Sequence, residues 1–434
     1  MTNECSEFLI ITEELEADDI AIGMLMDSSS EEENGQINSA RKGKSPNKER
    51  DFVGAYASVI KNYFNGIESV YSEADFERRF RCPRPVFDRI QEALEGTDPF
   101  IQKKDALGKM GIHPLVKLVG CFRYLTYGDA LDREDENLYI AESTLDGYVK
   151  KFTKLVKAKF GSHYLNRPPT SMERKAISTA MKGKGFPGCL GSWDCKHFNW
   201  KNCPMRLAGQ HQGHAEGGKK TLILEAISDH RKYIWYANFG DPGSLNDINV
   251  LDRSSIVGSL LSGDIGITTA PYTINGNRRD WMYFLVDGIY PDWAIFVSTF
   301  STTTDPKKLK FSAAQERVRK DIECAFGIIV QQFHVLQRPL RNWYLEDIID
   351  LLHCCVIIHN MIVEFRHGDL GYDEEAIEGK KFPLFGCNEI TPGLASLQGV
   401  DLFAARVAAF DDAMTSSFEH YKLKGDLLEH INST

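Results

Sequence analysis

The sequence predicts an α/β protein in which an all-helical region precedes the sheet. Two changes of pattern lead to this prediction. Over residues 51–180 apolar residues recur at three- and four-residue spacing, which is the spacing of one face of a helix. From about residue 186 the chain turns to short runs rich in β-branched and aromatic residues, which are typical of strands. The 434 residues, 42% of them hydrophobic and 26% charged, are enough for two or three globular domains.

Residues 1–50 are predicted to be a disordered tail, acidic at first and then basic. The first 33 residues contain eleven Asp and Glu residues and no Lys or Arg. A segment with so few apolar groups and so much charge cannot offset the entropy of ordering the chain. Without those eleven acids the net charge of −10 becomes +1, so the rest of the chain is compatible with local binding to DNA. The basic residues 41–50 fit either a nuclear-import signal or a solvated linker.

The helical region, residues 51–180, is predicted to bind DNA. Helices are expected at residues 57–70, 85–94, 113–128 and 145–160. The last two are joined by a short polar connector, and the final helix is rich in lysine. One interpretation is a helix-turn-helix whose lysines contact phosphates, and the other is a helical bundle with a solvated face. The lysines expected to contact DNA are Lys150, Lys151, Lys154 and Lys157.

A sheet domain is predicted over residues 181–370. Its strands are expected at residues 190–200, 221–227, 233–239 and 281–286, with a hairpin turn at 229–232. Long helices follow at residues 311–333 and 348–365, and residues 371–434 are expected to form a loop and a helical extension. Three strands, a connection, a buried strand and a helix follow the order of a ribonuclease H-like fold.

Two acids of the sheet domain lie where a charge is costly to bury. Asp194 lies inside an apolar strand, and Asp287 ends the run Phe284-Leu-Val-Asp, just before Gly288. A buried carboxylate needs a cation, a metal ion or hydrogen-bond donors. Acids at strand ends that face one crevice are where open α/β sheets place their functional sites. Taken singly, each acid also has a purely structural interpretation.

Two further acids have alternative interpretations. Glu323, on the helix 311–333, is either a metal ligand or the partner of Arg319 in a surface ion pair. Gly327 on the same helix costs about 1 kcal/mol relative to Ala, which indicates close approach of another backbone or of DNA. Asp247 follows Asn246 at a helix start, so either residue fits an N-cap, and Asp247 also fits a metal ligand.

Oxygen ligands from separate segments suit Mg²⁺ or Mn²⁺ rather than zinc. Two such ions activate a water or a 3′-hydroxyl on one side of a phosphorus and stabilise the leaving oxygen on the other. The expected metal ligands are Asp194, Asp247, Asp287 and Glu323. Zinc is disfavoured, because the spacing of its candidate ligands fits neither paired CxxC motifs nor a zinc finger. Those candidates are Cys195, Cys203, His211 and His214.

Six ordered segments together resemble the PIF/Harbinger transposases, and most closely the branch described as plant transposon proteins. The segments begin at Gly191, Trp200, Pro242, Asp287, Arg319 and His359, and the resemblance covers about residues 75–370. It implies a ribonuclease H-like core whose catalytic acids are Asp194, Asp287 and Glu323, with Asp247 as an additional acid. The interval of 36 residues between Asp287 and Glu323 matches the spacing of the last two members of such triads.

The chain departs from the family pattern at two positions beside the acids. Trp193 replaces a smaller aliphatic residue, and it is expected to point to the opposite face of the strand from Asp194. Cys324 stands where Arg is common, which weakens an expected contact with DNA or with an acid. The first departure concerns packing more than catalysis.

The resemblance implies a DNA endonuclease and strand-transferase that uses two Mg²⁺ or Mn²⁺ ions on transposon ends. The alternative is a domesticated derivative that binds DNA or chromatin without cleavage. Expected partners are terminal-repeat duplex DNA, contacted in part by Arg319 and Lys320, a Myb-like DNA-binding protein and further copies of the chain. We expect a nuclear protein that shuttles with the cytoplasm.

No membrane partner is expected, because no apolar run approaches the ~20 residues needed to span a bilayer. No signal peptide is visible at the N-terminus either, so the sequence predicts a soluble intracellular protein. The ten cysteines are scattered, which predicts reduced and mostly buried thiols.

Overall fold

The computed structural model describes residues 48–213, 217–257, 271–279, 281–368 and 414–433. The described residues from Asp51 onward form one compact unit. The tail predicted to be disordered lies, up to residue 47, outside the described residues. The loop predicted at residues 371–400 also lies outside them.

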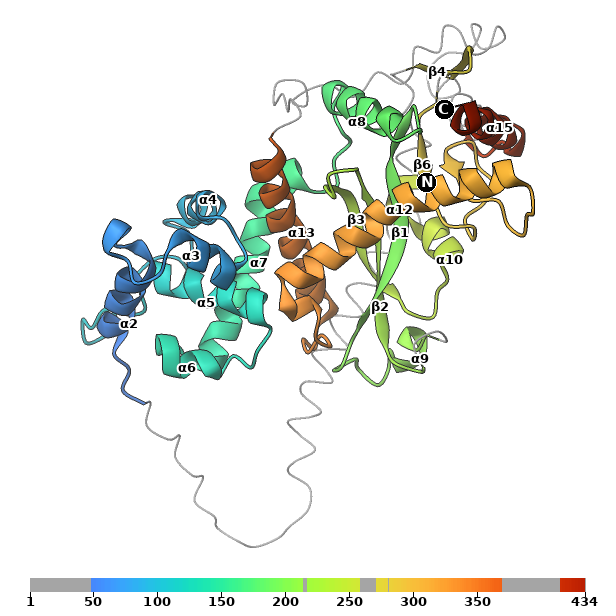
Figure 1. The fold of residues 1–434 in the computed structure, drawn as a ribbon. Helices are drawn as coiled ribbons and strands as arrows, with labels where there is room; N and C mark the ends of the chain where they lie inside the picture. Colours follow the sequence, from blue (N-terminus) through green and yellow to red (C-terminus); the bar gives the residue numbers. More distant parts are fainter. Residues whose placement is uncertain (1–47, 214–216, 258–270, 280, 369–413, 434) are drawn as a thin grey trace, which may run out of the picture. The chain divides into compact units, whose positions relative to one another are not determined.

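The N-terminal part of the compact unit is helical, as the sequence predicts. Its α-helices are α2 (Phe52–Val59), α3 (Glu73–Phe80), α4 (Arg84–Leu94), α5 (Pro114–Tyr127), α6 (Arg133–Leu138), α7 (Glu142–Tyr164) and α8 (Ser171–Gly183) (Figure 1). The helix predicted at residues 57–70 is wrong in its bounds. The α-helix ends at Val59 and continues as a π-helical turn, Ile60–Phe64, which stops at Asn65. Gly66 then adopts a φ of 59°, a conformation that favours glycine, and begins a short 3₁₀ helix, Gly66–Glu68.

Helices α5 and α7 belong to a helical bundle. Helix α6 separates them in the chain, and α7 packs both against α5 and against α13 (Leu345–His367) of the sheet domain. Helix α5 ends at Gly128, whose φ is 58°. A Cβ at Gly128 would lie 2.7 Å from the Cα of Val335, so only glycine allows the chain before α13 to approach this closely. These contacts favour the bundle interpretation over a free recognition helix.

The sheet domain is built on a mixed five-stranded sheet among the described residues. Its strands are β1 (Cys189–Asn199), β2 (Thr221–Ser228), β3 (Ile234–Pro242), β6 (Tyr283–Leu285) and β7 (Phe296–Val297), in the order β3-β2-β1-β6-β7 (Figure 1). The pairs β1–β2 and β2–β3 are antiparallel, whereas β1–β6 and β6–β7 are parallel. The four predicted strands are therefore present. A second sheet, β4 (Tyr272–Ile274) with β5 (Asn277–Arg279), was not expected.

Long helices cover the sheet. Helix α12 (Pro306–Gln332) packs on β1 and β2, and α13 packs on β3. Helix α8 also packs on β1, and the C-terminal helix α15 (Ser417–Ser433) packs on α12 (Figure 1). Short helices α9 (Ala208–His211) and α10 (Asp247–Arg253) lie in the connections around β2 and β3. The long helices begin earlier than predicted, because Pro306 and Leu345 already occupy their first turns.

Helix α13 corrects one expectation from the sequence. It is 23 residues long and apolar enough to cross a membrane by length and composition, although no run of that kind was expected. Its most apolar window is 78% buried inside the protein. That burial is typical of a core helix, which is apolar on all sides because it is covered on all sides.

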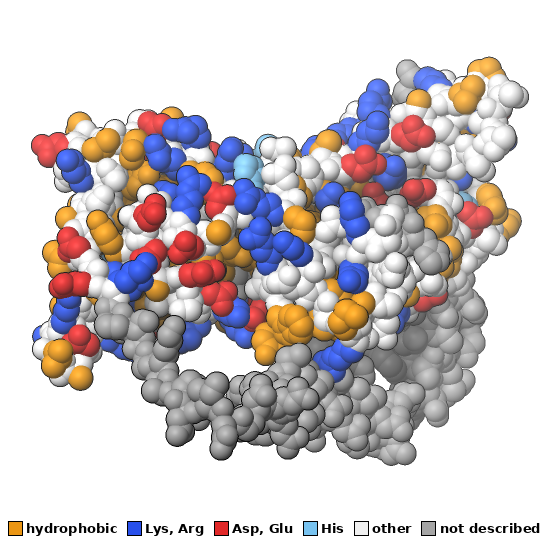
Figure 2. Space-filling model, turned by 90° about the horizontal axis from the view of Figure 1, so that it is seen from below, with side chains coloured by type: hydrophobic (Ala, Val, Ile, Leu, Met, Phe, Trp, Pro, Cys, Tyr) orange, Lys and Arg blue, Asp and Glu red, His pale blue; other side chains and the backbone are white. Residues whose placement is uncertain are grey.

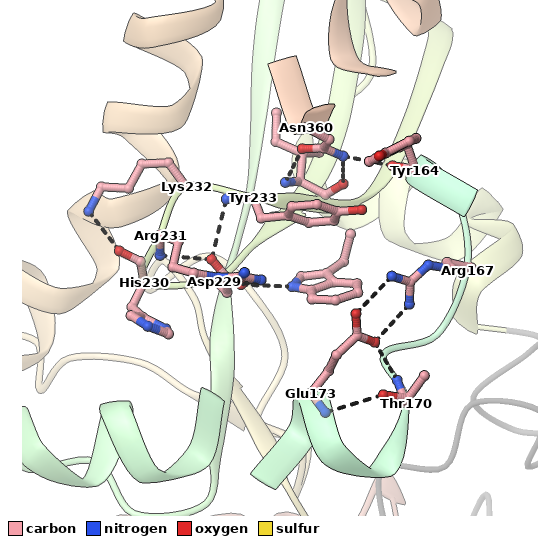
Figure 3. Close-up of polar contacts among 12 residues, drawn as sticks. Tyr164, Arg167, Thr170, Glu173, Asp229, His230, Arg231, Lys232, Tyr233 and Asn360 are labelled. Atoms are coloured by element: carbon pink, nitrogen blue, oxygen red, sulfur yellow. Dashed lines mark hydrogen bonds and ion pairs between the residues drawn. The ribbon is translucent and has the colours of Figure 1, made fainter. Parts of the chain in front are cut away.

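A polar cluster around Asp229, the Asp229 cluster, ties the β2–β3 turn to the helices (Figure 3). Asp229 is fully buried and accepts hydrogen bonds from Arg231 and from the indole of Trp235. Asn360 of α13 bonds to the backbone of Ile234 and to the carbonyl oxygen of Tyr164 at the end of α7. The cluster thus connects the sheet, α13 and the helical region through buried hydrogen bonds. A second ion pair in the same view joins Arg167 to Glu173 in the first turn of α8.

Candidate functional site

Asp194 lies in the middle of β1 with its side chain only 15% exposed. One carboxylate oxygen accepts the N–H of Cys195 at 2.9 Å, and the other lies 3.2 Å from Nη1 of Arg319. Burial raises the pKa of Asp194 to about 6. The charges of Asp247 and Glu323 also raise this pKa, whereas the Cys195 N–H and the charge of Arg319 lower it. The carboxylate is therefore only partly compensated by its neighbours.

Arg319 of α12 lies between two of the predicted catalytic acids. Its Nη2 atom is 2.9 Å from Oε1 of Glu323, one helical turn further along, and its Nη1 atom reaches Asp194. The surface ion pair considered for Glu323 is thus present, and it extends to β1. Arg319 was expected to contact DNA, and in the structure it contacts carboxylates.

Asp247 begins α10, but the N-cap is Asn246, whose side chain accepts the N–H of Asn249 at 2.9 Å. Asp247 is therefore free of a capping role. Burial raises the pKa of the Asp247 carboxyl, and the charge of Asp287 raises this pKa further. The charge of His197 and a hydrogen bond from Cys195 lower it. Asp247 and Asp287 are thus electrostatic neighbours.

Asp287 lies two residues after the end of β6, the parallel neighbour of β1. It is exposed, and its carboxylate accepts the N–H of Ile289 at 3.3 Å. Because Ser192 of β1 pairs with Leu285 of β6 in this parallel pair, Asp287 lies beyond the carboxyl end of β6 but beside the middle of β1. The segment therefore brings an exposed carboxylate to the part of β1 beside which Asp247 also lies.

The four acids surround one part of β1 without converging on one point. Asp194 faces Arg319, whereas Asp247 contacts Cys195, the next residue of β1, and neighbouring strand residues point to opposite faces. Within the part of the chain that the structure describes, no three Asp, Glu, His or Cys side chains are placed to hold a metal ion. A shared ion would require Arg319 to release Asp194 and Glu323.

The donor set fits a hard cation rather than zinc. The four acids offer only oxygen ligands, and the repulsion at Asp194 is of the kind that a divalent cation relieves. The candidate zinc ligands bond elsewhere: the thiol of Cys195 lies 3.7 Å from the hydroxyl of Tyr290, and the ring of His211 bonds to the carbonyl oxygen of Thr221. His214 lies outside the described residues.

The lysines of α7 expected to contact DNA have acidic partners. Lys150 pairs with Asp146 and Asp347, and Lys157 pairs with Asp350 at 2.8 Å. The others follow the same pattern: Lys154 with Asp347, and Lys151 with Asp98. Acidic and basic side chains are likewise intermixed on the face shown in Figure 2. Lys320 differs from them, since it is exposed and forms no ion pair with any described residue.

One acid of this region was missed by the sequence analysis. Glu225 of β2 is 1% exposed and accepts hydrogen bonds from the indole of Trp193 at 3.0 Å and from the hydroxyl of Ser254 at 2.7 Å. Burial raises its pKa to about 7. The signal was an acid inside the apolar run Leu222-Ile-Leu-Glu-Ala-Ile, the same signal that identified Asp194. The unusual Trp193 therefore has a structural partner, on the face away from Arg319.

Comparisons with known proteins find a family match for the part of the chain that contains these residues. Residues 162–369 match the family model described as plant transposon protein. This segment is similar to plant transposon proteins. It contains the sheet, α12 and α13, and with them the four acids of this transposon-related segment. Residues 56–95 match a domain of unknown function. No curated protein and no solved structure matches the chain.

Proposed function

We propose that the chain is a metal-dependent DNA endonuclease and strand-transferase of the PIF/Harbinger type, acting on transposon ends. The main observation behind the proposal is which elements of the fold supply the three acids. Asp194 comes from β1, Asp287 from the end of the adjacent parallel strand β6, and Glu323 from α12, which packs on β1. The strand order β3-β2-β1-β6-β7, with only β2 antiparallel to its neighbours, supports a ribonuclease H-like core.

In this proposal Asp194, Asp287 and Glu323 hold two Mg²⁺ or Mn²⁺ ions, with Asp247 as an additional ligand. Such ions, when bound, activate a water or 3′-hydroxyl and stabilise the leaving oxygen. The protein contributes the largely buried carboxylate of Asp194, whose pKa is raised to about 6 by burial first and then by the neighbouring charges of Asp247 and Glu323. Arg319 pairs with Asp194 and Glu323 in the absence of metal, and in this proposal its guanidinium, once released, would contact a DNA phosphate.

The proposal extends to partners and compartment. Terminal-repeat duplex DNA would be the substrate, and a Myb-like protein would supply sequence-specific binding. This division suits a chain with few unpaired lysines on α7 and a net charge of −10. Further copies of the chain would pair two DNA ends, and the reaction would take place in the nucleus.

One observation favours a second candidate function. Arg319 already neutralises two of the acids, and the described side chains do not form a metal-binding group. A domesticated protein that binds DNA or chromatin without cleavage would keep such an ion pair. The two functions differ in whether a divalent cation displaces Arg319.

A nicking assay separates these functions. Wild type, Asp194→Asn and Glu323→Gln are incubated with terminal-repeat DNA and Mg²⁺ or Mn²⁺, and Lys175→Gln serves as a surface control. We expect wild type and the control to nick DNA and both acid variants to lose at least about 100-fold in rate, since each lost acid removes metal-ion stabilisation of the transition state. Equal nicking by all four proteins would reject the catalytic assignment. Binding without nicking in wild type would favour the second function.

A further inference from the structure

A second charged site lies on α12, away from the acids. Here α8, α12 and α15 surround a cavity of about 510 Å³. Its charged lining is basic: Lys182 and Lys184 come from the end of α8, and Lys310 and Arg317 come from α12, with His430 of α15 beside them. The described residues that line the cavity include no Asp or Glu. Proximity of like charges without acids is costly unless an anion is bound.

The charges of the cavity are only partly balanced by the protein. Lys184 bonds to Asp321 at 2.6 Å, but Asp321 is shared with Lys232 at 2.7 Å, so one carboxylate serves two ammonium groups. Lys310 and Arg317 are exposed and form no ion pair with any described residue. This arrangement differs from α7, where acids of α13 face the lysines. The cavity therefore keeps a net positive charge.

The uncharged lining of the cavity is made largely of small residues. Gly183, Gly185, Ala313 and Ala314 line the cavity together with the basic residues. Because these positions carry no long side chains, they leave room for a bulky anionic group beside the lysine and arginine side chains. A tetrahedral phosphate surrounded by Lys and Arg donors matches this combination of shape and charge.

We propose that this cavity binds backbone phosphates of the DNA strand that crosses α12 on its way to the acids, an inference that rests on the proposed function. Arg317 precedes Glu323 by six residues and Lys310 precedes it by thirteen. At 1.5 Å per residue they lie about 9 and about 20 Å from Glu323 along the helix. With a rise of about 3.4 Å per nucleotide, the cavity holds phosphates roughly three to six nucleotides from the one at the acids.

On the surface of α12, Lys320 lies between the cavity and Glu323. With 3.6 residues per turn, Arg317 is about 120° around α12 from Glu323, and Lys320 lies about midway between them. Lys320 is exposed and forms no ion pair with the described residues. Gly327 lies on the same exposed ridge, and no atom of another described segment lies within 4 Å of the position of a Cβ there. The close approach expected at Gly327 is therefore not made by another described segment, which leaves the ridge open to a DNA strand.

The test measures binding of a fluorescein-labelled duplex to the full chain by anisotropy in EDTA, as a function of salt concentration. Phosphate contacts are independent of sequence, so an arbitrary duplex is sufficient. In Lys310→Gln/Arg317→Gln we expect the slope of log affinity against log salt to fall by about 1.8, because each lost contact removes about 0.9. Between about 50 and about 200 mM salt the variant then loses about tenfold less affinity than wild type. The charge-preserving Lys310→Arg/Arg317→Lys should keep the wild-type slope.

Lys104→Gln/Lys175→Gln is the matched control, since it removes two exposed lysines that lie outside the cavity. A slope in Lys310→Gln/Arg317→Gln equal to that of the control would overturn the inference. A separate titration with inorganic triphosphate distinguishes the source of the phosphate. Triphosphate binding that is lost in the variant while the duplex slope stays unchanged would assign the cavity to a free polyphosphate, and would also overturn it. Because binding is measured without metal, either result leaves the proposed nuclease function to be decided by the nicking assay.

Discussion

Asp229 and Asp194 are carboxylates of the same sheet, yet their surroundings are opposite. Asp229, just after β2, accepts the N–H of Arg231 at 2.7 Å and its guanidinium at 2.8 Å, and it also accepts the indole N–H of Trp235 at 3.3 Å. Asp194, in β1, has one backbone donor and one contact with Arg319 at 3.2 Å, and acids lie nearby. Both carboxylates are largely buried, but Asp229 has more hydrogen-bond donors around it than Asp194.

This difference distinguishes a buried acid that stabilises the fold from a buried acid that can take part in a functional site. At Asp229 the donors come from the same turn, so the sequence that creates the buried charge also supplies its partners within six residues (Figure 3). At Asp194 the compensating charge comes from α12, 125 residues away, and is shared with Glu323. Because one guanidinium is shared by Asp194 and Glu323, the two carboxylates together keep a negative charge that can bind a further cation. The Asp229 cluster has no such remaining capacity.

The largest effect is expected from breaking the satisfied carboxylate. Asp229→Ala leaves the guanidinium of Arg231, whose side chain is 8% exposed, without its counter-ion. Removing one partner of a buried ion pair costs about 3–5 kcal/mol, so the free energy of unfolding in urea should fall by that amount. The control Arg78→Ala breaks an exposed, solvent-screened pair with Asp75 and should change the free energy of unfolding little. A loss as small as that of the control would show that the Asp229 cluster is not a stabilising element.

A smaller effect of opposite sign is expected from Asp194→Asn. The pKa of Asp194 is raised from 3.8 to about 6 in the folded protein, so the folded state binds the proton more tightly than the unfolded state. The stability that this proton confers is fully present below pH 3.8 and is lost as the pH rises through 6. At pH 7.5 the neutral Asn should therefore raise the free energy of unfolding by up to about 3 kcal/mol.

Urea titrations of wild type and Asp194→Asn at several pH values between 4 and 7.5 test this sign. The two proteins should differ little at pH 4, where Asp194 is largely protonated in the folded state, and should diverge as the pH rises through about 6. Asn keeps the acceptor for the N–H of Cys195, so that hydrogen bond is not an added variable. A variant that is less stable than wild type at pH 7.5 would mean that the ion pair with Arg319 outweighs burial and repulsion.

The contrast also explains how much of the molecule could be predicted from the sequence. The strands and long helices follow from apolar periodicity, which is a local property, and Asp194 is visible as an acid inside an apolar run. The β4–β5 hairpin was missed, because each of its strands is only three residues long and because it is held by a distant helix: Arg279 pairs with Glu419 and Asp426 of α15. Such contacts span about 140 residues and leave no local pattern.

The site was predictable in its residue types and less so in its arrangement. The pairing of Arg319 with Glu323 follows from their spacing of one helical turn, and it was considered from the sequence. The reach of Arg319 to Asp194 depends on how α12 packs on β1, and no local pattern encodes that packing. The same limit applies to the lysines of α7, whose acidic partners Asp347 and Asp350 lie on α13. In both cases a residue expected to contact DNA contacts an acid from an element that is distant in the sequence.

The smallest effect is expected from adding a divalent cation, which tests whether the acids around Asp194 keep the capacity that Asp229 lacks. Mg²⁺ at ten times its Kd should stabilise wild type by about 1.4 kcal/mol, because it binds the folded state preferentially. Thermal melting with Mg²⁺ and with NaCl of equal ionic strength measures this difference. Asp194→Asn/Glu323→Gln should not respond, since two oxygen ligands are lost. Arg319→Gln should respond at lower Mg²⁺ than wild type, because no internal cation competes for the two acids. If Mg²⁺ shifts the melting of the double variant as much as that of wild type, the ion binds elsewhere, and Arg319 is the resident counter-ion of a site that is no longer used.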